Sequence, residues 1–184
     1  MMCLPKPVIG LMGSSYFAGW TASILFVSRI ADSKGRKAVF FWSLVISIIT
    51  MFCMVYVSRN FYFSMSMMFI SGAATSGRTT TGYIYAGEFL AQKWRIAFGV
   101  AFIFLNGLTG LLITLYFDFV NKHYVYIAAW GIAETIIAVT ATKMYGVESP
   151  LWLLKKGRVM EAQVILRKLQ FVNKVDLDSE IDDL

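Results

Sequence analysis

Long uncharged stretches, separated by short polar clusters, set the hydrophobic pattern of this chain. At a rise of about 1.5 Å per residue, a helix of about 20 apolar residues crosses the hydrocarbon core of a bilayer. The charged residues inside these stretches are Arg78 in the third and Glu134 in the fifth. The pattern predicts an all-α integral membrane fold in which residues 1–145 form a bundle of five transmembrane helices, over 8–28, 38–58, 61–87, 96–117 and 124–142.

The composition supports this assignment. Hydrophobic residues make up 58% of the 184 residues, charged residues only 15%, and the mean hydropathy is +0.63; soluble domains are about half apolar and a quarter charged. The formal net charge is +6, but the basic residues form short clusters between apolar runs rather than one basic stripe, which argues against nucleic acid as a partner. An aromatic content of 16% excludes a disordered chain.

Residues for metal or hydrolytic chemistry are scarce. The one histidine, His123, lies in a polar loop, and the two cysteines, Cys3 and Cys53, cannot form a disulfide framework. A histidine-based metal site or a Ser-His-Asp triad lacks the residues it needs. We therefore expect no enzyme activity, no metal and no cofactor.

The basic residues also predict an orientation, because loops on the cytoplasmic side carry an excess of Lys and Arg. One side has Arg29, Lys34, Arg36, Lys37, Lys93, Arg95, Lys143, Lys155, Lys156 and Arg158. The other side has Lys6, Arg59 and Lys122. This asymmetry predicts a multi-pass protein with its N-terminus outside and its C-terminal tail in the cytoplasm; the membrane itself is not identified.

Small residues recur every four positions in two stretches, as expected where membrane helices approach closely. They are Gly10, Ser14, Ala18 and Ala22 in the first stretch and Gly72, Ser76 and Thr80 in the third. We interpret both ridges as helix-packing positions.

Residues 146–184 have a different character. Ser149 and Pro150 suit the start of a short helix, and Gly157 suits its end. An apolar stripe then predicts an amphipathic helix at the cytoplasmic interface, followed by an acidic tail; the stripe is Ala162, Ile165, Leu166 and Leu169.

The two charges within the membrane have three interpretations. Arg78 and Glu134 lie at comparable depths, so they can form a structural ion pair. Alternatively, Arg78 lines a solute pathway and attracts an anionic group. In the third interpretation, its side chain extends to the membrane surface.

Three segments carry a family resemblance. The loop RIADSKGRKAVFF contains Asp32, Gly35, Arg36 and Lys37, and it resembles the loop between the second and third helices of the major facilitator superfamily, with Ser28 and Ser33 as departures. Glu88 and Arg95 in EFLAQKWR have the spacing found after the fourth helix of sugar porters and organic cation transporters. The segment VESPLWLL resembles their motif after helix six through Glu148, Ser149, Pro150 and Trp152, with Val147 and Leu151 as departures.

The resemblance runs from about residue 8 to 169 and equates the five stretches with family helices two to six, within the N-terminal half. It implies alternating access, in which two helical halves move about a central site. It also implies that Asp32 packs against the other half, that Arg36 pairs with Glu88, and that the charged residues of the first two segments form a conformational gate. The candidate solute pathway comprises Tyr16, Trp20, Arg78, Tyr83, Asn106 and Glu134.

The resemblance therefore predicts part of a secondary transporter for a small organic solute such as a sugar or an organic ion. Its partners would be the lipid bilayer, the solute, and a second helical half or other membrane subunits. The alternative is a transporter-derived structural or accessory subunit of a larger membrane complex, since five helices leave the central site without its opposite wall. The family motifs are altered at Ser28, Ser33, Val147 and Leu151. These departures fit that alternative as well as they fit ordinary sequence divergence.

Overall fold

The computed structural model describes residues 6–57, 60–120 and 123–173, with the backbone alone at residue 6 and residues 169–173. Within these ranges every regular element is a helix, which confirms the all-α prediction. Arg59, Lys122 and the acidic tail, which the sequence places in polar segments, lie outside the described residues.

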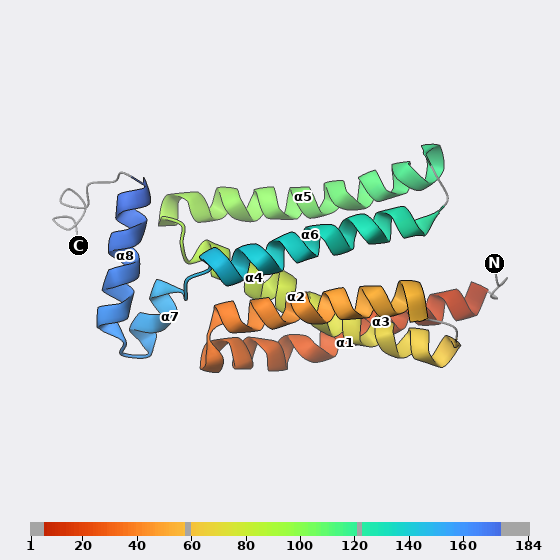
Figure 1. Ribbon diagram of the computed structural model, residues 1–184, viewed down its shortest axis with the longest axis horizontal. Coiled ribbons are helices and arrows are strands. Elements are labelled where there is room, and N and C mark those ends of the chain that lie inside the picture. Colours follow the sequence, from red (N-terminus) through yellow and green to blue (C-terminus); the bar gives the residue numbers. More distant parts are fainter. Residues whose placement is uncertain (1–5, 58–59, 121–122, 174–184) are drawn as a thin grey trace.

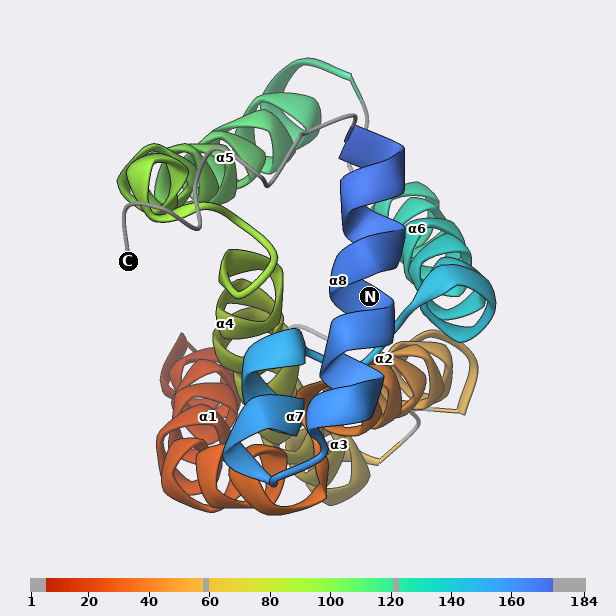
Figure 2. The same ribbon diagram turned by 90° about the vertical axis from the view of Figure 1, so that its left-hand side faces the viewer.

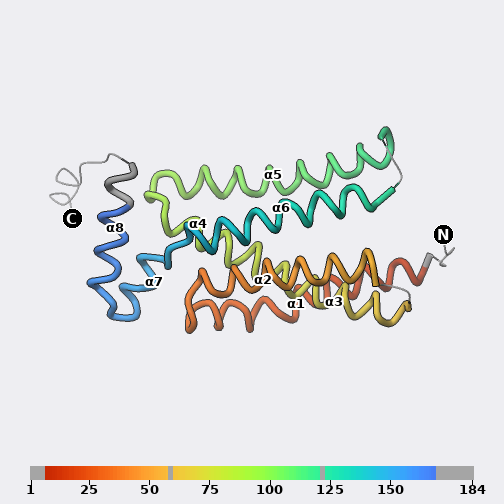
Figure 3. The backbone as a smooth tube through the Cα atoms, in the orientation of Figure 1, coloured from red at the N-terminus to blue at the C-terminus, as the bar shows by residue number. Residues whose placement is uncertain are grey.

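The helices form a bundle with a small appendage at one end (Figures 1 and 3). Helices α1, α2 and α3 form one group, α5 and α6 lie beside it, and α4 passes between them (Figures 1 and 2). Helices α7 and α8 cover one end, with α8 running across the bundle direction. The bounds are α1 Lys6–Lys34, α2 Arg36–Phe52, η1 Cys53–Val57, α3 Phe61–Ser76, η2 Gly77–Thr81, α4 Gly82–Gly87, α5 Gln92–Phe119, α6 Tyr124–Tyr145, α7 Pro150–Lys155 and α8 Val159–Asn173.

Four helical segments are long and apolar enough to cross a membrane, and they match the first, second, fourth and fifth predicted stretches. They are Pro7–Lys34, Arg36–Val57, Gln92–Phe119 and Tyr124–Tyr145. The third stretch, 61–87, is helical throughout but divided into α3, the π-helix η2 and α4. Its division falls at Arg78, where the sequence has a charge between small and β-branched residues.

Helices α1 and α3 meet backbone to backbone. A Cβ atom added at Gly19 would lie 2.0 Å from the carbonyl oxygen of Phe69, and one added at Gly72 would lie 2.0 Å from that of Tyr16. Ser15 donates a hydrogen bond to the Met65 carbonyl at 2.9 Å. Small residues and interhelical hydrogen bonds are the features that associate helices in lipid.

The packing ridge of α1 differs from the predicted one. Its partner-facing positions are Ser15, Gly19 and Ser23, whereas the predicted ridge of Gly10, Ser14, Ala18 and Ala22 is exposed. Two positions of the predicted ridge of the third stretch, Gly72 and Ser76, are buried, as expected. In a helix that is apolar all round, a four-residue spacing of small residues occurs on several faces, so spacing alone does not identify the packed one.

Helix α5 contrasts with α1 because none of its residues is buried. Helix α5 contacts α4 through aromatic rings. The ring of Tyr83 stacks on that of Phe98 with centroids 5.6 Å apart, and its centroid lies 5.3 Å from that of Phe102. Ile96 and Phe119 are 80% and 82% exposed. Apolar side chains exposed on this scale indicate contact with lipid or with another membrane helix.

The terminal helices begin and end as predicted. The Ser149 hydroxyl accepts a hydrogen bond from the Trp152 N–H at 3.3 Å, which caps α7, and Pro150 occupies its first turn. Gly157 follows this helix with φ +76°. On α8, Ala162 is fully buried and Ile165 half-buried, while Leu166 is exposed; the side chain of Leu169 is outside the described part.

Candidate functional site

The turn between α1 and α2 consists of one residue, Gly35. Its φ of 104° lies in the left-handed region, where a side chain is strained. A Cβ atom at this position would also lie 2.9 Å from a carboxylate oxygen of Glu148. Glycine therefore serves both the turn and the close approach of Glu148.

Arg36, the first residue of α2, joins two acidic residues. Its guanidinium lies 3.1 Å from Glu88 and 3.4 Å from Asp32. The side chains of Arg36 and Glu88 are only 10% and 11% exposed, whereas that of Asp32 is 69% exposed. The Arg36–Glu88 ion pair expected from the resemblance is present, and burial makes it the stronger of the two interactions.

Glu148 caps the N-terminus of α2. Its Oε1 accepts hydrogen bonds from the backbone N–H groups of Arg36 at 2.8 Å and Lys37 at 3.0 Å. The first N–H groups of a helix have no partner within the helix, and a negative charge is favourable at that end. The carboxylate thus attaches the segment after α6 to the start of α2.

The linker between α6 and α7 is attached at further points. The Lys37 ammonium donates to the carbonyl of Gly146 at 2.6 Å. Tyr85 on α4 donates its hydroxyl hydrogen to the carbonyl of Val147. On α7, directly after the linker, the Trp152 indole N–H donates to the carbonyl of Asp32 at 2.9 Å. We call Asp32, Arg36, Lys37, Tyr85, Glu88, Glu148 and Trp152 the helix-end cluster.

The cluster contains unused hydrogen-bonding capacity. Arg36 Nε and Glu88 Oε2 are buried and have no hydrogen-bond partner among the described residues. A buried polar atom left unpaired costs about 1–3 kcal/mol. The central ion pair therefore rests on one nitrogen–oxygen contact rather than on a bidentate one.

Arg95 lies apart from the cluster. Its side chain is exposed, and its Nε donates to the carbonyl of Leu90 at 3.3 Å, just before its own helix. Glu88 instead pairs with Arg36. The E-x6-R spacing therefore does not bring its two ends together in this structure.

The candidate pathway residues are scattered. The hydroxyl of Tyr16 donates to Thr75 Oγ1 at 3.1 Å, between α1 and α3, and Trp20 lies one turn further along α1, with its ring 6.3 Å from that of Tyr16. Asn106 is exposed and donates to the carbonyl of Phe102 in its own helix at 2.7 Å. Tyr83 packs on α5 as described above.

Arg78 and Glu134 do not pair. Within the described ranges no ion pair includes either residue; Arg78 is half-buried in η2, while Glu134 is exposed on α6 and accepts a hydrogen bond from the indole of Trp130. The structural ion pair considered from the sequence is therefore wrong. The equal depth predicted from the sequence was not sufficient to bring the two side chains into contact.

The described ranges also contain no group of three His, Cys, Asp or Glu side chains that could hold a metal ion.

Tyr85, a member of the helix-end cluster, was not predicted from the sequence. Its position one helical turn before Glu88 was the available signal, because residues three apart lie on one face of a helix.

Comparison with known families assigns the chain. The family described as "Sugar (and other) transporter" matches residues 4–183. The chain belongs to this transporter family. The resemblance to the major facilitator superfamily, in the sugar porter and organic cation transporter branch, is thereby confirmed.

The proteins similar to this chain include organic cation transporters. An organic cation transporter protein of Drosophila melanogaster is 30% identical over 98% of this chain, which covers 32% of the relative. Organic cation/carnitine transporter 2 of Arabidopsis thaliana is 29% identical over 97% of this chain and 34% of the relative. The human organic cation/carnitine transporter 2 is 26% identical over 92% and 30%, respectively. The chain thus spans about a third of the length of these relatives.

Proposed function

We propose that this chain forms the N-terminal part of a secondary transporter that moves a small organic ion or sugar by alternating access. The observation that carries the proposal is the helix-end cluster, in which the Arg36–Glu88 ion pair and the Glu148 cap join the ends of α1, α2, α4 and the α6–α7 linker. The names of the relatives favour an organic ion, and the family description includes sugars.

The cluster would act as a conformational gate at the cytoplasmic end. An ion pair that rests on one contact contributes little to the total fold energy, but a difference of a few kcal/mol decides which of two conformations is populated. Formation of the pair would hold the cytoplasmic helix ends together. Its rupture would release them as the halves move.

Arg78 is the residue we assign to the solute pathway most directly. It is half-buried within the π-helix η2 and takes part in none of the ion pairs of the described residues. A guanidinium in that position attracts an anionic group, so a solute with a carboxylate fits it best. Tyr16, Trp20, Tyr83, Asn106 and Glu134 remain candidates with a positioning or packing role.

The proposed activity needs a partner that supplies the opposite wall of the pathway. The partner would be a second helical half or another membrane subunit, with the N-terminus of this chain outside and the tail in the cytoplasm. Gentle extraction from the source membrane, a native gel and mass spectrometry would identify it. A complementary helical half supports the transporter; a stoichiometric place in a large unrelated complex supports the accessory subunit instead.

A substitution tests the gate. In native membranes, Glu88→Gln removes one charge of the ion pair while keeping its shape, and we expect it to change the population open to each side. The measurement is labelling of a single-cysteine reporter at Tyr16 by an impermeant maleimide applied from either side, in a background without Cys3 and Cys53. Glu161→Gln is the matched control, because it breaks the ion pair between Arg158 and Glu161 at the start of α8, where the two side chains are 52% and 55% exposed. Unchanged labelling in Glu88→Gln contradicts the gate.

Uptake tests the solute class. Membranes that contain the native particle would be assayed with radiolabelled carnitine, tetraethylammonium and glucose. Arg78→Ala should reduce uptake of the carboxylate-bearing solute most, and Arg78→Lys should retain part of it. Uptake that is indifferent to both substitutions contradicts the assignment of Arg78.

A further inference from the structure

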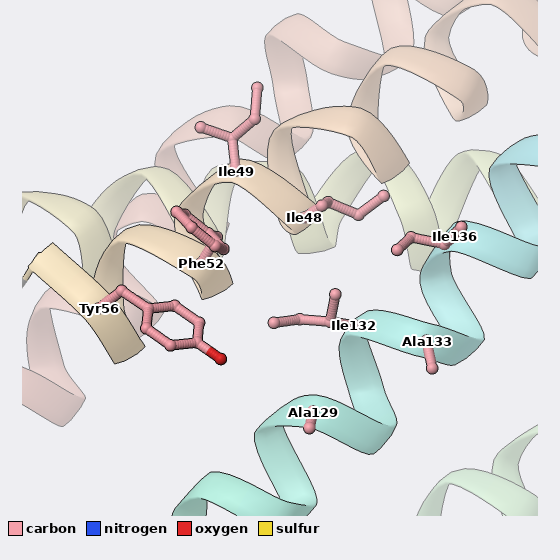
Figure 4. A pocket seen from close by; sticks show the side chains of 8 residues that line it. All are labelled: Ile48, Ile49, Phe52, Tyr56, Ala129, Ile132, Ala133 and Ile136. Carbon is pink, nitrogen blue, oxygen red and sulfur yellow. The ribbon is translucent and has the colours of Figure 1, made fainter.

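An apolar groove runs between α2 with η1 and α6 (Figure 4). Its volume is about 540 Å³, and each side supplies four of its eight lining residues. Ile48, Phe52 and Tyr56 line one side, and Ala129, Ala133 and Ile136 line the other. The volume lies within the range of small-molecule sites, about 300–1,000 Å³.

The local sequence explains why the groove exists. Helix α2 changes from α to π geometry directly after Phe52, which alters the spacing of the side chains that follow. On α6, Ala129 and Ala133 are one turn apart and present small side chains to the groove. The two helices come close together at Met51 and Gly131, since a Cβ atom added at Gly131 would lie 3.4 Å from the terminal methyl of Met51.

The chemistry of the groove fits hydrocarbon. No charged residue lines it, and the side-chain polar atom it contains is the Tyr56 hydroxyl, which points into the groove beside Ile132 (Figure 4). The groove belongs to two segments that are long and apolar enough to cross a membrane. Its rims continue into an exposed apolar surface, since Ile49, Phe52 and Ile136 are 55%, 52% and 48% exposed.

The groove also has a direction. Tyr56 lies next to the C-terminal end of Arg36–Val57, and Ala129 lies close to the N-terminal end of Tyr124–Tyr145. Both line the same groove. Ile48 lies eight residues further into its segment, about 12 Å by helical rise. Tyrosine side chains favour the membrane–water interface, where lipid ester groups lie. The polar end of the groove is therefore at interface depth and its apolar end within the hydrocarbon core.

We propose that this groove binds one acyl chain of a bilayer phospholipid, with the Tyr56 hydroxyl donating a hydrogen bond to an ester carbonyl oxygen. A polar solute would leave its own polar groups unpaired in such a groove. Helices α2 and α6 also lie on the side of the bundle away from α1 and α5 (Figure 2). The candidate pathway residue on α6, Glu134, is not among the residues that line the groove. The proposal requires a membrane location and does not depend on the proposed transport.

The test uses the full chain in phosphatidylcholine vesicles that contain a trace of phosphatidylcholine with a diazirine in the middle of one acyl chain. Photolysis followed by mass spectrometry maps the labelled residues. We expect labelling of the groove residues to exceed that of α5, whose side chains are all unburied and report the bulk lipid. Tyr56→Phe should lower this excess.

Two substitutions on α6 provide the matched comparison. Ala133→Trp fills the groove and should reduce its labelling to the level of α5. Ile137→Trp adds the same ring at a position that is 68% exposed and outside the lining, and should leave the excess unchanged. If Ala133→Trp fails to fold, as judged by circular dichroism, Ala133→Leu replaces it.

Three outcomes overturn the proposal. Equal labelling of the groove and α5 indicates ordinary boundary lipid. An excess that disappears when a small part of the phosphatidylcholine is replaced by cholesterol indicates a sterol site. A groove that stays unlabelled while α5 is labelled indicates that protein covers it.

Discussion

The α1–α3 pair and helix α5 differ in how closely they pack against their neighbours. Helices α1 and α3 approach until a Cβ atom at Gly19 or Gly72 would overlap the backbone of the other helix. Helix α5 has glycines too, but at Gly107 and Gly110 a Cβ atom would meet no atom within 4 Å. The same residue type thus marks a completed contact in one region and an open surface in the other.

The difference follows from the solvent. In lipid, apolar side chains gain little by leaving their surroundings, so helices associate through close backbone approach and interhelical hydrogen bonds. The α1–α3 pair has both, including the bond from Ser15 to the Met65 carbonyl. Helix α5 contacts α4 through stacked rings on Tyr83, and the rest of its surface is available to lipid or a partner.

The largest effect should come from Gly72→Ala. The added methyl group would overlap the backbone of Tyr16, so the helices must separate, and we expect a loss at the top of the ~1–3 kcal/mol range for overpacking. The measurement is the free energy of unfolding in mixed micelles. Gly10→Ala is the control on α1, where no atom lies within 4 Å. Equal free energies of unfolding for the two variants would show that the close approach of α1 and α3 does not contribute to stability.

A smaller loss is expected at the start of α2, where a side chain contacts the backbone. Glu148→Ala leaves the first N–H groups of α2 without their cap, which costs about 0.5–2 kcal/mol. Glu148→Gln keeps an acceptor oxygen and should recover part of this stability. Thermal unfolding of all three proteins would measure it, and a Glu148→Ala variant as stable as the parent would contradict the cap.

On α5 the sign should reverse. Gly110→Ala adds a methyl group into open space and replaces the residue with the highest conformational freedom in a helix, so we expect a gain of about 0.5–1 kcal/mol. The same unfolding measurement applies. A loss in the isolated chain would mean that Gly110 is already packed. A loss seen only in the native particle would locate a partner helix on α5.

The smallest effect is expected for Glu134→Gln on α6. The carboxylate is exposed and its hydrogen bond comes from Trp130, one turn away, so we expect a change within about 0.5 kcal/mol. Circular dichroism and the unfolding midpoint would test this. Failure of this variant to fold would restore a structural role for the two charges within the predicted spans, with Arg78 as the first partner to examine.

The sequence was sufficient to predict where the helices lie along the chain, but not which of their faces contact one another. Uncharged length predicts a span because the bilayer thickness is fixed, and the caps at Ser149 and Gly157 depend on local chemistry. The π-helix η2 was not predicted, since its residues contain no local signal that separates π from α geometry. The packed face of α1 was also missed, because an apolar helix lacks the hydrophobic periodicity that marks a buried face in water.

The candidate site was predicted in part for a similar reason. The resemblance placed Arg36 beside Glu88, and the ion pair is present. It did not reveal that Glu148 would cap α2, or that Arg95 would point away from Glu88, since both depend on how distant helix ends meet. A charge pattern shows which side chains could form ion pairs. Which of these pairs form depends on how the helices are arranged.

The cap on α2 has a consequence for the order of assembly. The backbone N–H of Arg36 and the carboxylate of Glu148 are separated by 112 positions. At a synthesis rate of about 5–20 residues per second, roughly 6–22 s pass between them. During that interval the start of α2 has neither its carboxylate nor the linker carbonyl that Lys37 binds. Closure of the cluster is therefore a late event in biogenesis, and it reports that α6 has been inserted.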